Sequence, residues 1–335
     1  MIAKLRCYCY GLLLLGGVLV SPNSGAATTK PQVVNDVIAQ QLTAGKLVAL
    51  GDVHGSPSIV QQLMGFLADP EHWQQVDDIA VEFGNSRYQA LADSYIVDGA
   101  ALELSQVRPI WRDTLYFMAW QYDVYEQLVL QLRHWNQTRT HKVRLVLAEP
   151  ALDWSSLTAE GWQQQVAARE QGYQQIITQQ VLQPKRRGIL LFGTFHMMKQ
   201  PIIMQDGTSF SSLVTLLRQQ QAAEIYTIWP RMAGDNVIAQ ADAPYLLPLA
   251  NSVLGQQPFS DITRRVSAAE STLLRDVADG YLFLASTERK APYSQAALSE
   301  LAWHQELLRR AAVVGQRSGQ QIERWVSQHA PAAAQ

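Results

Sequence analysis

Two histidines and one glutamate stand where their side chains could activate water or hold a metal. His54 ends the motif Gly51-x-x-His54, His196 ends Gly193-x-x-His196, and each motif follows a short apolar run. Glu82 lies inside a third apolar run, where an unpaired carboxylate would be costly to bury. Imidazole and carboxylate groups serve as general bases and as ligands of divalent metals. We therefore expect His54, Glu82 and His196 to form a catalytic centre, in which each glycine lets the backbone turn so that the imidazole points over the sheet.

A structural explanation is open for each of these residues. A histidine after a strand is also an ordinary loop or core residue whose ring is satisfied by hydrogen bonds. Glu82 could instead form an ion pair with Arg87 or Arg112. Two histidines in the same context favour a shared site.

Further polar residues are candidates for the same site: all but Arg112 follow one of the apolar runs, and Arg112 has Trp111 and Asp113 as its neighbours. Asp52 and Glu149 are additional metal ligands or bases. Arg112 is a catalytic cation that would stabilise a developing oxyanion. Asn85, Asp153 and Arg231 are candidates for substrate binding. Arg112 could equally pair with Glu103 or Asp113 at the surface. Glu149 and Asp153 could equally cap the helix that follows them.

The elements that must position these residues alternate between strand-like and helix-like segments. Five short apolar runs predict buried strands, at 46–50, 78–83, 143–148, 188–192 and 224–229, and a sixth at 280–285 predicts an edge strand. Helical spacing is predicted at 33–42, 57–67, 122–135, 162–182 and 294–329, the last divided near 315–319. This order predicts a three-layer α/β fold with a mainly parallel central sheet, helices on both faces and a helical C-terminal region. Ligands of such sheets bind beyond the carboxyl ends of the strands, where the candidate residues lie.

We expect one domain over residues 31–329, with a loop-rich segment at 230–258 that forms a lid or an insertion. Residues 1–26 have the pattern of a signal peptide, with Lys4 and Arg6 before the apolar run 11–20 and small residues at 24–26. Export to the periplasm or the medium as a soluble protein is therefore predicted, with no stable membrane insertion after cleavage. An uncleaved membrane anchor is the alternative.

Composition excludes several kinds of chemistry. Both cysteines, Cys7 and Cys9, fall within the predicted signal, so the mature chain would have no disulfide, thiolate nucleophile or cysteine-ligated metal. Removing the signal leaves 25 basic and 29 acidic residues, a net charge of −4, which argues against a nucleic-acid partner. The sequence also lacks the G-x-S-x-G, G-x-x-x-x-G-K, G-x-G-x-x-G and H-E-x-x-H motifs.

The motifs resemble two families. The block from Gly51 to Gly55 (GDVHG) resembles the opening D-x-H block of calcineurin-like metallophosphoesterases, in which Asp52 and His54 would bind metal, but the later G-D-x-x-D and G-N-H blocks are missing. The ordered set of Gly51-x-x-His54, Glu82 and Gly193-x-x-His196 resembles the superfamily of erythromycin-esterase-like, haem-binding ChaN-like and TraB or Tiki-type proteins. The likeness extends from about residue 48 to 285, and Asp52 stands where the first motif usually has a glutamate.

The superfamily resemblance implies three activities: ester hydrolysis by a metal-free histidine and glutamate pair, metal-dependent proteolysis, and haem binding. We expect an exported hydrolase for a small-molecule or peptide substrate, with His54, Glu82, His196 and Arg112 as catalytic residues. A divalent metal, where one takes part, would be held by Asp52, His54, Glu82, Glu149 and His196. Haem or metal binding in uptake is the alternative function, and a metallophosphoesterase-like enzyme is the third.

Overall fold

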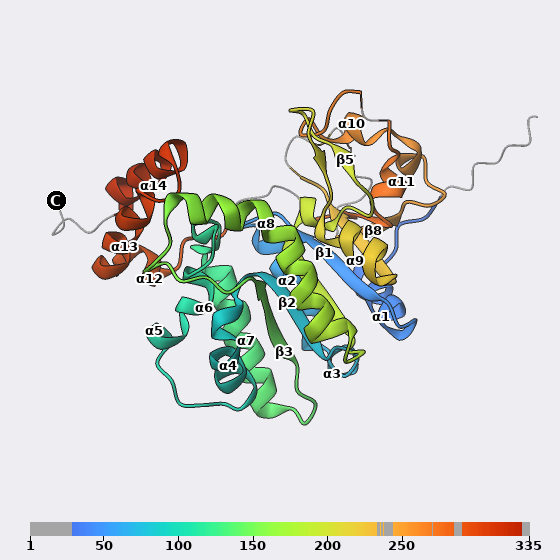
Figure 1. Ribbon diagram of the computed structural model, residues 1–335. Coiled ribbons are helices and arrows are strands. Elements are labelled where there is room, and N and C mark those ends of the chain that lie inside the picture. The colour runs from blue at the N-terminus through green and yellow to red at the C-terminus, as the bar shows by residue number, and fades with distance from the viewer. Residues whose placement is uncertain are drawn as a thin grey trace, which may run out of the picture.

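A seven-stranded sheet forms the centre of the fold (Figure 1). The computed structural model describes residues 29–232, 235, 237, 244–269, 271–284 and 290–329, so the predicted signal at 1–26 lies outside the described residues. The strand order is β3-β2-β4-β1-β7-β9-β8, and only β8 runs antiparallel to its neighbour. The predicted α/β fold with a mainly parallel sheet is thereby confirmed. The strand bounds are Leu47–Asp52 (β1), Asp78–Asn85 (β2), Arg144–Glu149 (β3), Gly188–Gly193 (β4), Ile225–Pro230 (β7), Tyr245–Pro248 (β8) and Gly280–Phe283 (β9).

The prediction was wrong about the edge of the sheet. The strand expected at the edge, β9, lies between β7 and β8, and the edge strand β8 comes from the segment that was expected to be loop-rich. β8 has only four residues and ends at Pro248, so it lacks the length that identifies a strand in a sequence. The hairpin of β5 (Ile202–Ile203) and β6 (Ser209–Phe210) was also missed, because each of its strands has two residues.

Helices cover both faces of the sheet, and α8 lies in front of it in Figure 1. One face packs against α1, α2 and α7 through residues such as Val48 and Leu50, and the other packs against α8 and α9 through Ala49 and Ala80. The longer helices are α1 (Val34–Thr43), α2 (Pro57–Ala68), α7 (Asp123–Thr138), α8 (Ala159–Ile177), α9 (Leu213–Gln221), α13 (Leu301–Ala311) and α14 (Gln316–His329). The short ones are α3 (Pro70–Trp73), α4 (Gln89–Ala92), α5 (Leu104–Val107), α6 (Pro109–Arg112), α10 (Phe259–Ile262), α11 (Leu274–Val277) and α12 (Gln295–Ser299).

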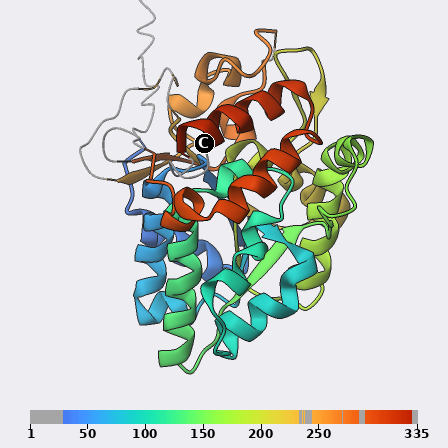
Figure 2. The same cartoon turned by 90° about the vertical axis from the view of Figure 1, so that its left-hand side faces the viewer.

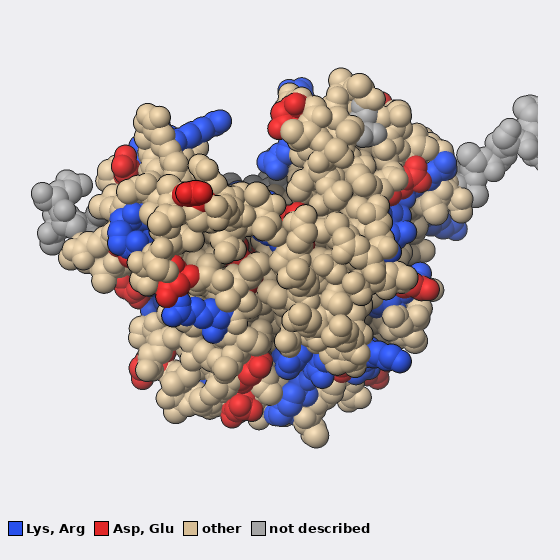
Figure 3. Space-filling view, in the orientation of Figure 1, with Lys and Arg blue, Asp and Glu red and all other residues tan. Residues whose placement is uncertain are grey.

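Two groups of elements rise on either side of the carboxyl edge of the sheet. One group consists of α12, α13 and α14, and the other of β5, β6, α10 and α11 (Figure 1, and Figure 2 from the side). Each group has an apolar core of its own, around Trp303 and Trp325 in the first and around Trp229 and Phe259 in the second. The surface is hollowed between them (Figure 3), directly above the ends of the central strands.

No helix within the described ranges is both long enough and apolar enough to cross a membrane.

A buried arginine attaches the C-terminal helices to the rest of the molecule. Arg310 of α13 is 3% exposed and forms ion pairs with Asp113, 2.5 Å from Oδ1, and with Glu306, 2.6 Å from Oε1. Its guanidinium also stacks 4.6 Å from the ring of Trp154 and 5.0 Å from that of Trp303. Because these partners come from three separate parts of the chain, this side chain holds the helical group in place.

The substitution Arg310→Ala tests this attachment. Removing one partner of a buried ion pair leaves the other carboxylates without compensation, so we expect the free energy of unfolding to fall by about 3 kcal/mol. Denaturant unfolding followed by circular dichroism measures the change, and Arg317→Ala, at an exposed position of α14, is the matched control. Equal stability of the two variants would contradict the assignment.

Candidate functional site

The three residues singled out from the sequence meet at the carboxyl edge of the sheet. Glu82 lies between the two histidines: its Oε1 is 3.3 Å from His196 Nε2, and its Oε2 is 4.0 Å from His54 Nε2. The backbone N–H of Gly193 donates to Oε2 at 2.7 Å. Glu82 is 3% exposed, so the carboxylate is buried but surrounded by groups that stabilise its charge.

The sheet explains why these residues converge. β2, β4 and β1 are consecutive in the sheet, so their carboxyl ends present Glu82, His196 and His54 side by side. Side chains alternate between the two faces of a strand, and Glu82 follows Ala80 on the face that packs against α8. Asp52 follows Leu50 on the opposite face, which packs against α7. His54 lies beyond the strand end and can contact both carboxylates.

Asp52 orients His54. Its Oδ2 is 3.1 Å from His54 Nδ1 and also accepts a hydrogen bond of 2.7 Å from the hydroxyl of Tyr125 in α7. The Tyr125 oxygen in turn accepts from the backbone N–H of Gly55 at 2.8 Å. A neutral His54 that donates from Nδ1 to a carboxylate keeps the lone pair on Nε2, which is the nitrogen that faces the pocket and Glu82.

His196 lies between two carboxylates. Its Nδ1 is 2.6 Å from Oε1 of Glu170, which α8 supplies, and Nε2 faces Glu82. Burial opposes the charged imidazole, but Glu170 and Glu82 outweigh that cost and raise the pKa of His196 to about 9. Burial likewise opposes ionisation of Glu82, yet the charge of His196 and its hydrogen bond hold the pKa of Glu82 well below the usual range. At neutral pH the site therefore contains an imidazolium flanked by two carboxylates.

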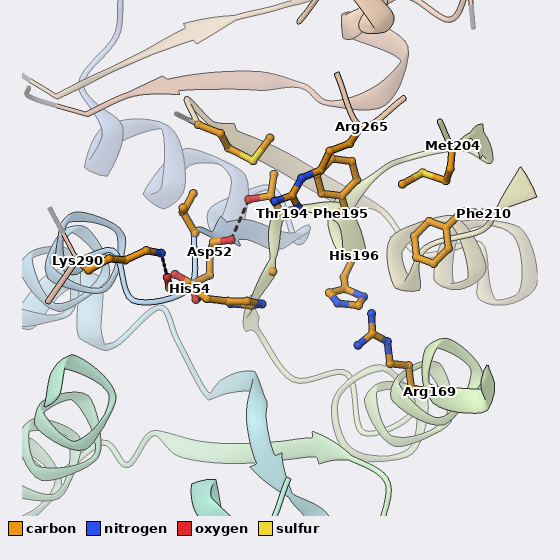
Figure 4. A pocket seen from close by; sticks show the side chains of 13 residues that line it. Asp52, His54, Arg169, Thr194, Phe195, His196, Met204, Phe210, Arg265 and Lys290 are labelled. Atoms are coloured by element: carbon orange, nitrogen blue, oxygen red, sulfur yellow. Dashed lines mark hydrogen bonds and ion pairs between the residues drawn. The ribbon is translucent and has the colours of Figure 1, made fainter. Parts of the chain in front are cut away.

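Arg169 brings a second cation to this cluster from α8. Its Nε is 3.5 Å from Glu170 Oε1, and its guanidinium lies 4.6 Å from the ring of Tyr116. In Figure 4, Arg169 and His196 point toward one another inside a cavity of about 420 Å³. Among the described residues, none accepts a hydrogen bond from the Arg169 guanidinium, which leaves its N–H donors directed at the cavity.

The two motif glycines are needed for space. Gly193 has φ −49°, which any residue adopts, but a Cβ there would lie 2.8 Å from His54 Cε1 and 3.1 Å from Glu82 Oε2. A Cβ on Gly51 would lie 2.7 Å from Pro230 Cδ. The expectation that these glycines let the backbone turn is thus wrong. They let the strands and the histidines approach closely.

The donor set does not fit a metal ion. Both nitrogens of His196 face carboxylates, and a protonated imidazole has no lone pair for a metal. Nδ1 of His54 is directed at Asp52, which leaves its Nε2 as the free nitrogen. Within the described part of the chain, no group of three or more His, Cys, Asp or Glu side chains is arranged to hold a metal. Accordingly, no metal-dependent step follows from this arrangement.

Four of the other candidates are not among the described residues that line the cavity, and three of them have structural partners. Arg112 pairs with Glu300 and stacks 4.7 Å from the ring of Trp303. The amide of Asn85 donates to the carbonyls of Asp113 and Leu152, at 2.7 and 2.9 Å. Asp153 pairs with Arg87 at the surface and accepts from Ser155, and Arg231 is not among the described residues that line the cavity. Polar residues that follow a strand therefore serve to attach loops and helices as well as to form a site.

Glu149 is buried beside the cluster without lining the cavity. It is 1% exposed, and its Oε2 accepts from the backbone N–H of Leu115 at 2.8 Å. Burial, opposed by that N–H, raises the pKa of Glu149 to about 8, so this carboxyl is largely protonated at neutral pH.

The sequence analysis missed Arg169, Glu170 and Tyr125. A signal was present for the first two, since they are the only charged residues between 162 and 182 in a segment otherwise rich in amides. Opposite charges in adjacent positions are typical of an exposed ion pair. Only the packing of α8 on the sheet places Arg169 and Glu170 against His196. Tyr125 belongs to the apolar pattern of α7, so nothing distinguished it from a core residue.

No protein-family model and no curated protein matches the chain. Solved structures do match. A succinoglycan biosynthesis protein matches at 11% identity with a TM-score of 0.52, covering 78% of this chain and 95% of its own. The erythromycin esterase EreC in its open conformation matches at 11% identity with a TM-score of 0.49, covering 77% and 94%.

ChaN of Campylobacter jejuni, in a structure with cofacial haem binding, matches at 14% identity with a TM-score of 0.41, covering 74% of this chain and 91% of its own. At these identities the likeness to the succinoglycan biosynthesis protein extends to the fold and not to a reaction.

The substitution Gly193→Ala tests the close approach of β4 to the site. The added methyl would displace His54 or Glu82, so we expect a loss of about 1 to 3 kcal/mol in the free energy of unfolding. Gly65→Ala is the matched control, because a Cβ at Gly65 in α2 meets nothing within 4 Å. Alanine inside a helix should leave that variant as stable as the parent or more so. The reverse order of stability would rule out the close packing.

Glu149→Gln tests the buried neutral carboxyl. A folded-state pKa of about 8, above the ordinary value of 4.5, means that the folded state holds a proton the unfolded state has lost, so stability falls as pH rises between these values. The amide cannot ionise. Between pH 5.5 and 7.5 we expect the parent to lose on the order of 1 to 2 kcal/mol relative to the variant. Urea titrations at both pH values measure this difference, and Glu160→Gln, at an exposed position, should follow the parent.

Proposed function

We propose that this protein is a hydrolase of ester, lactone or peptide bonds in which His54 activates water. The observation that carries the proposal is the Asp52–His54 pair, with the Nε2 of His54 free in a cavity that also contains an imidazolium and an arginine. A carboxylate that orients a histidine is a recurrent arrangement for general-base catalysis.

The reaction proceeds in two steps. In the first, Nε2 of His54 takes a proton from water as the water oxygen bonds to the carbonyl carbon, and the carbonyl π electrons move to the oxygen. In the second, the tetrahedral intermediate re-forms the carbonyl and expels the alkoxide or amine, which receives the proton from His54. His54 keeps its Nδ1 proton throughout, in the hydrogen bond that it donates to Asp52, and Glu82 stabilises the His54 imidazolium that forms between the steps.

Arg169 and His196 have different parts in stabilising the oxyanion. Arg169 supplies N–H donors that point into the cavity. Both nitrogens of His196 face carboxylates, so this residue contributes its positive charge and no free donor. Because the cluster is largely buried, these charges act in a medium of low dielectric and are already in position before the reaction begins.

The alternatives are less well supported. A haem-binding role would have to use Nε2 of His54 as the ligand, because both nitrogens of His196 face carboxylates and no tyrosine is among the described residues that line the cavity. A metallophosphoesterase would need metal ligands that the two histidines and their carboxylates do not offer.

The test is turnover of an ester, lactone, peptide and phosphoester panel by the purified protein and by His54→Gln. We expect kcat/KM for the active class to fall by about 10²- to 10⁴-fold, the usual contribution of a general base. His134→Gln, at an exposed position of α7, is the matched control and should retain parental activity. Equal turnover by the parent and His54→Gln would refute the assignment of the base, and a Soret band on adding haem without turnover of any ester would support the binding alternative.

A further inference from the structure

More positively charged side chains line the cavity than the proposed reaction requires. Besides the imidazolium of His196, the described lining includes three cations, Arg169, Arg265 and Lys290, against a single carboxylate, Asp52. Asp52 is 4% exposed and is directed at His54 and Tyr125. A substrate that enters the cavity therefore meets cations first.

Arg265 is held in place by its backbone and by a ring contact, and its guanidinium donates no hydrogen bond to a described residue. Its backbone carbonyl accepts a hydrogen bond of 2.9 Å from the N–H of Gln205, next to the β5–β6 hairpin. The guanidinium lies 5.2 Å from the ring of Phe195, which belongs to the 3₁₀ turn Thr194–Met197 after β4. Among the described residues, none accepts a hydrogen bond from this guanidinium, so its planar set of donors is free for a ligand.

Lys290 differs from Arg265 in having a partner. Its Nζ donates to the backbone carbonyl of His54. It adds charge at the mouth of the cavity and positions the turn that carries the histidine. The remaining wall around Arg265 is apolar, and it is made by Phe195, Met204, Phe210 and Met232.

On the basis of the proposed function, we infer that the substrate carries a negatively charged oxyanion group, a carboxylate or a phosphate, which Arg265 binds beside an apolar portion of the same molecule. Figure 4 shows Arg265 above Thr194 and Phe195, on the side of the cavity away from Arg169. The two arginines thus have separate tasks: Arg169 lies against His196 at the reacting carbonyl, and Arg265 anchors the substrate. Arginine suits this role because its fork of donors matches an oxyanion in two places.

Titration calorimetry with inorganic phosphate and with acetate, at low ionic strength, tests the anion subsite independently of turnover. We expect at least one of the two anions to bind, and Arg265→Gln to weaken that binding about tenfold. Arg264→Gln is the matched control, since Arg264 is the neighbouring arginine, is exposed and does not line the cavity. Stronger binding of phosphate assigns a phosphoryl group, and stronger binding of acetate assigns a carboxylate. Equal binding by Arg265→Gln and the parent would overturn the inference.

A pair of nitrophenyl esters extends the test to catalysis, one with a terminal carboxylate and one neutral ester of the same length. We expect Arg265→Gln to raise KM for the charged ester about tenfold with little change in kcat, and to leave the neutral ester unaffected. Anion binding without turnover of either ester would refute the hydrolase and support the subsite. Equal use of both esters, unchanged in Arg265→Gln, would refute the subsite and support the hydrolase.

Discussion

The ionised carboxylate of Glu82, buried between two histidines, is the constraint on which the rest of the site depends. A buried charge is tolerated only where opposite charges and hydrogen-bond donors surround it. Glu82 obtains these from the His196 ring, from the backbone N–H of Gly193 and from the His54 ring that faces it. Each compensating group must lie within a few ångströms, and this requirement accounts for the three adjacent strand ends and for the glycine between them.

The compensation continues outward on both faces of the sheet. On one side His196 needs its own second carboxylate, which α8 provides as Glu170, and Arg169 follows from the same helix turn. On the other side Asp52 is satisfied by His54 and by Tyr125 from α7. The three layers are thus linked through the site as well as through apolar packing. Positive and negative side chains alternate from the helix to the sheet. Several ionised groups can therefore lie together in a small buried volume.

The sequence predicted the framework better than the details. Short apolar runs identified the central strands, because a parallel sheet covered on both faces has few polar positions. Glu82, His54 and His196 were recognisable because each interrupts or directly follows such a run. Asn85 and Asp153 satisfied the same criterion, but their partners, the carbonyl of Leu152 and the side chain of Arg87, lie far along the chain. Position after a strand therefore identifies which edge a residue occupies and not what it contacts.

The amino-acid sequence by itself determined the alternation of strands and helices, the mainly parallel sheet and the strand ends at which reactive side chains collect, because these follow from local patterns of two to about twenty residues. Only the tertiary structure decided that α8 brings Arg169 and Glu170 to His196, that α7 brings Tyr125 to Asp52, and that Arg265 lies across the cavity from Arg169. These contacts join residues at least 26 positions apart, such as Glu170 and His196 or Asp52 and Tyr125, and no local pattern encodes which helix face will lie against which strand end. The same packing sets the charge of His196, since an imidazole between two buried carboxylates keeps its proton while an exposed one does not.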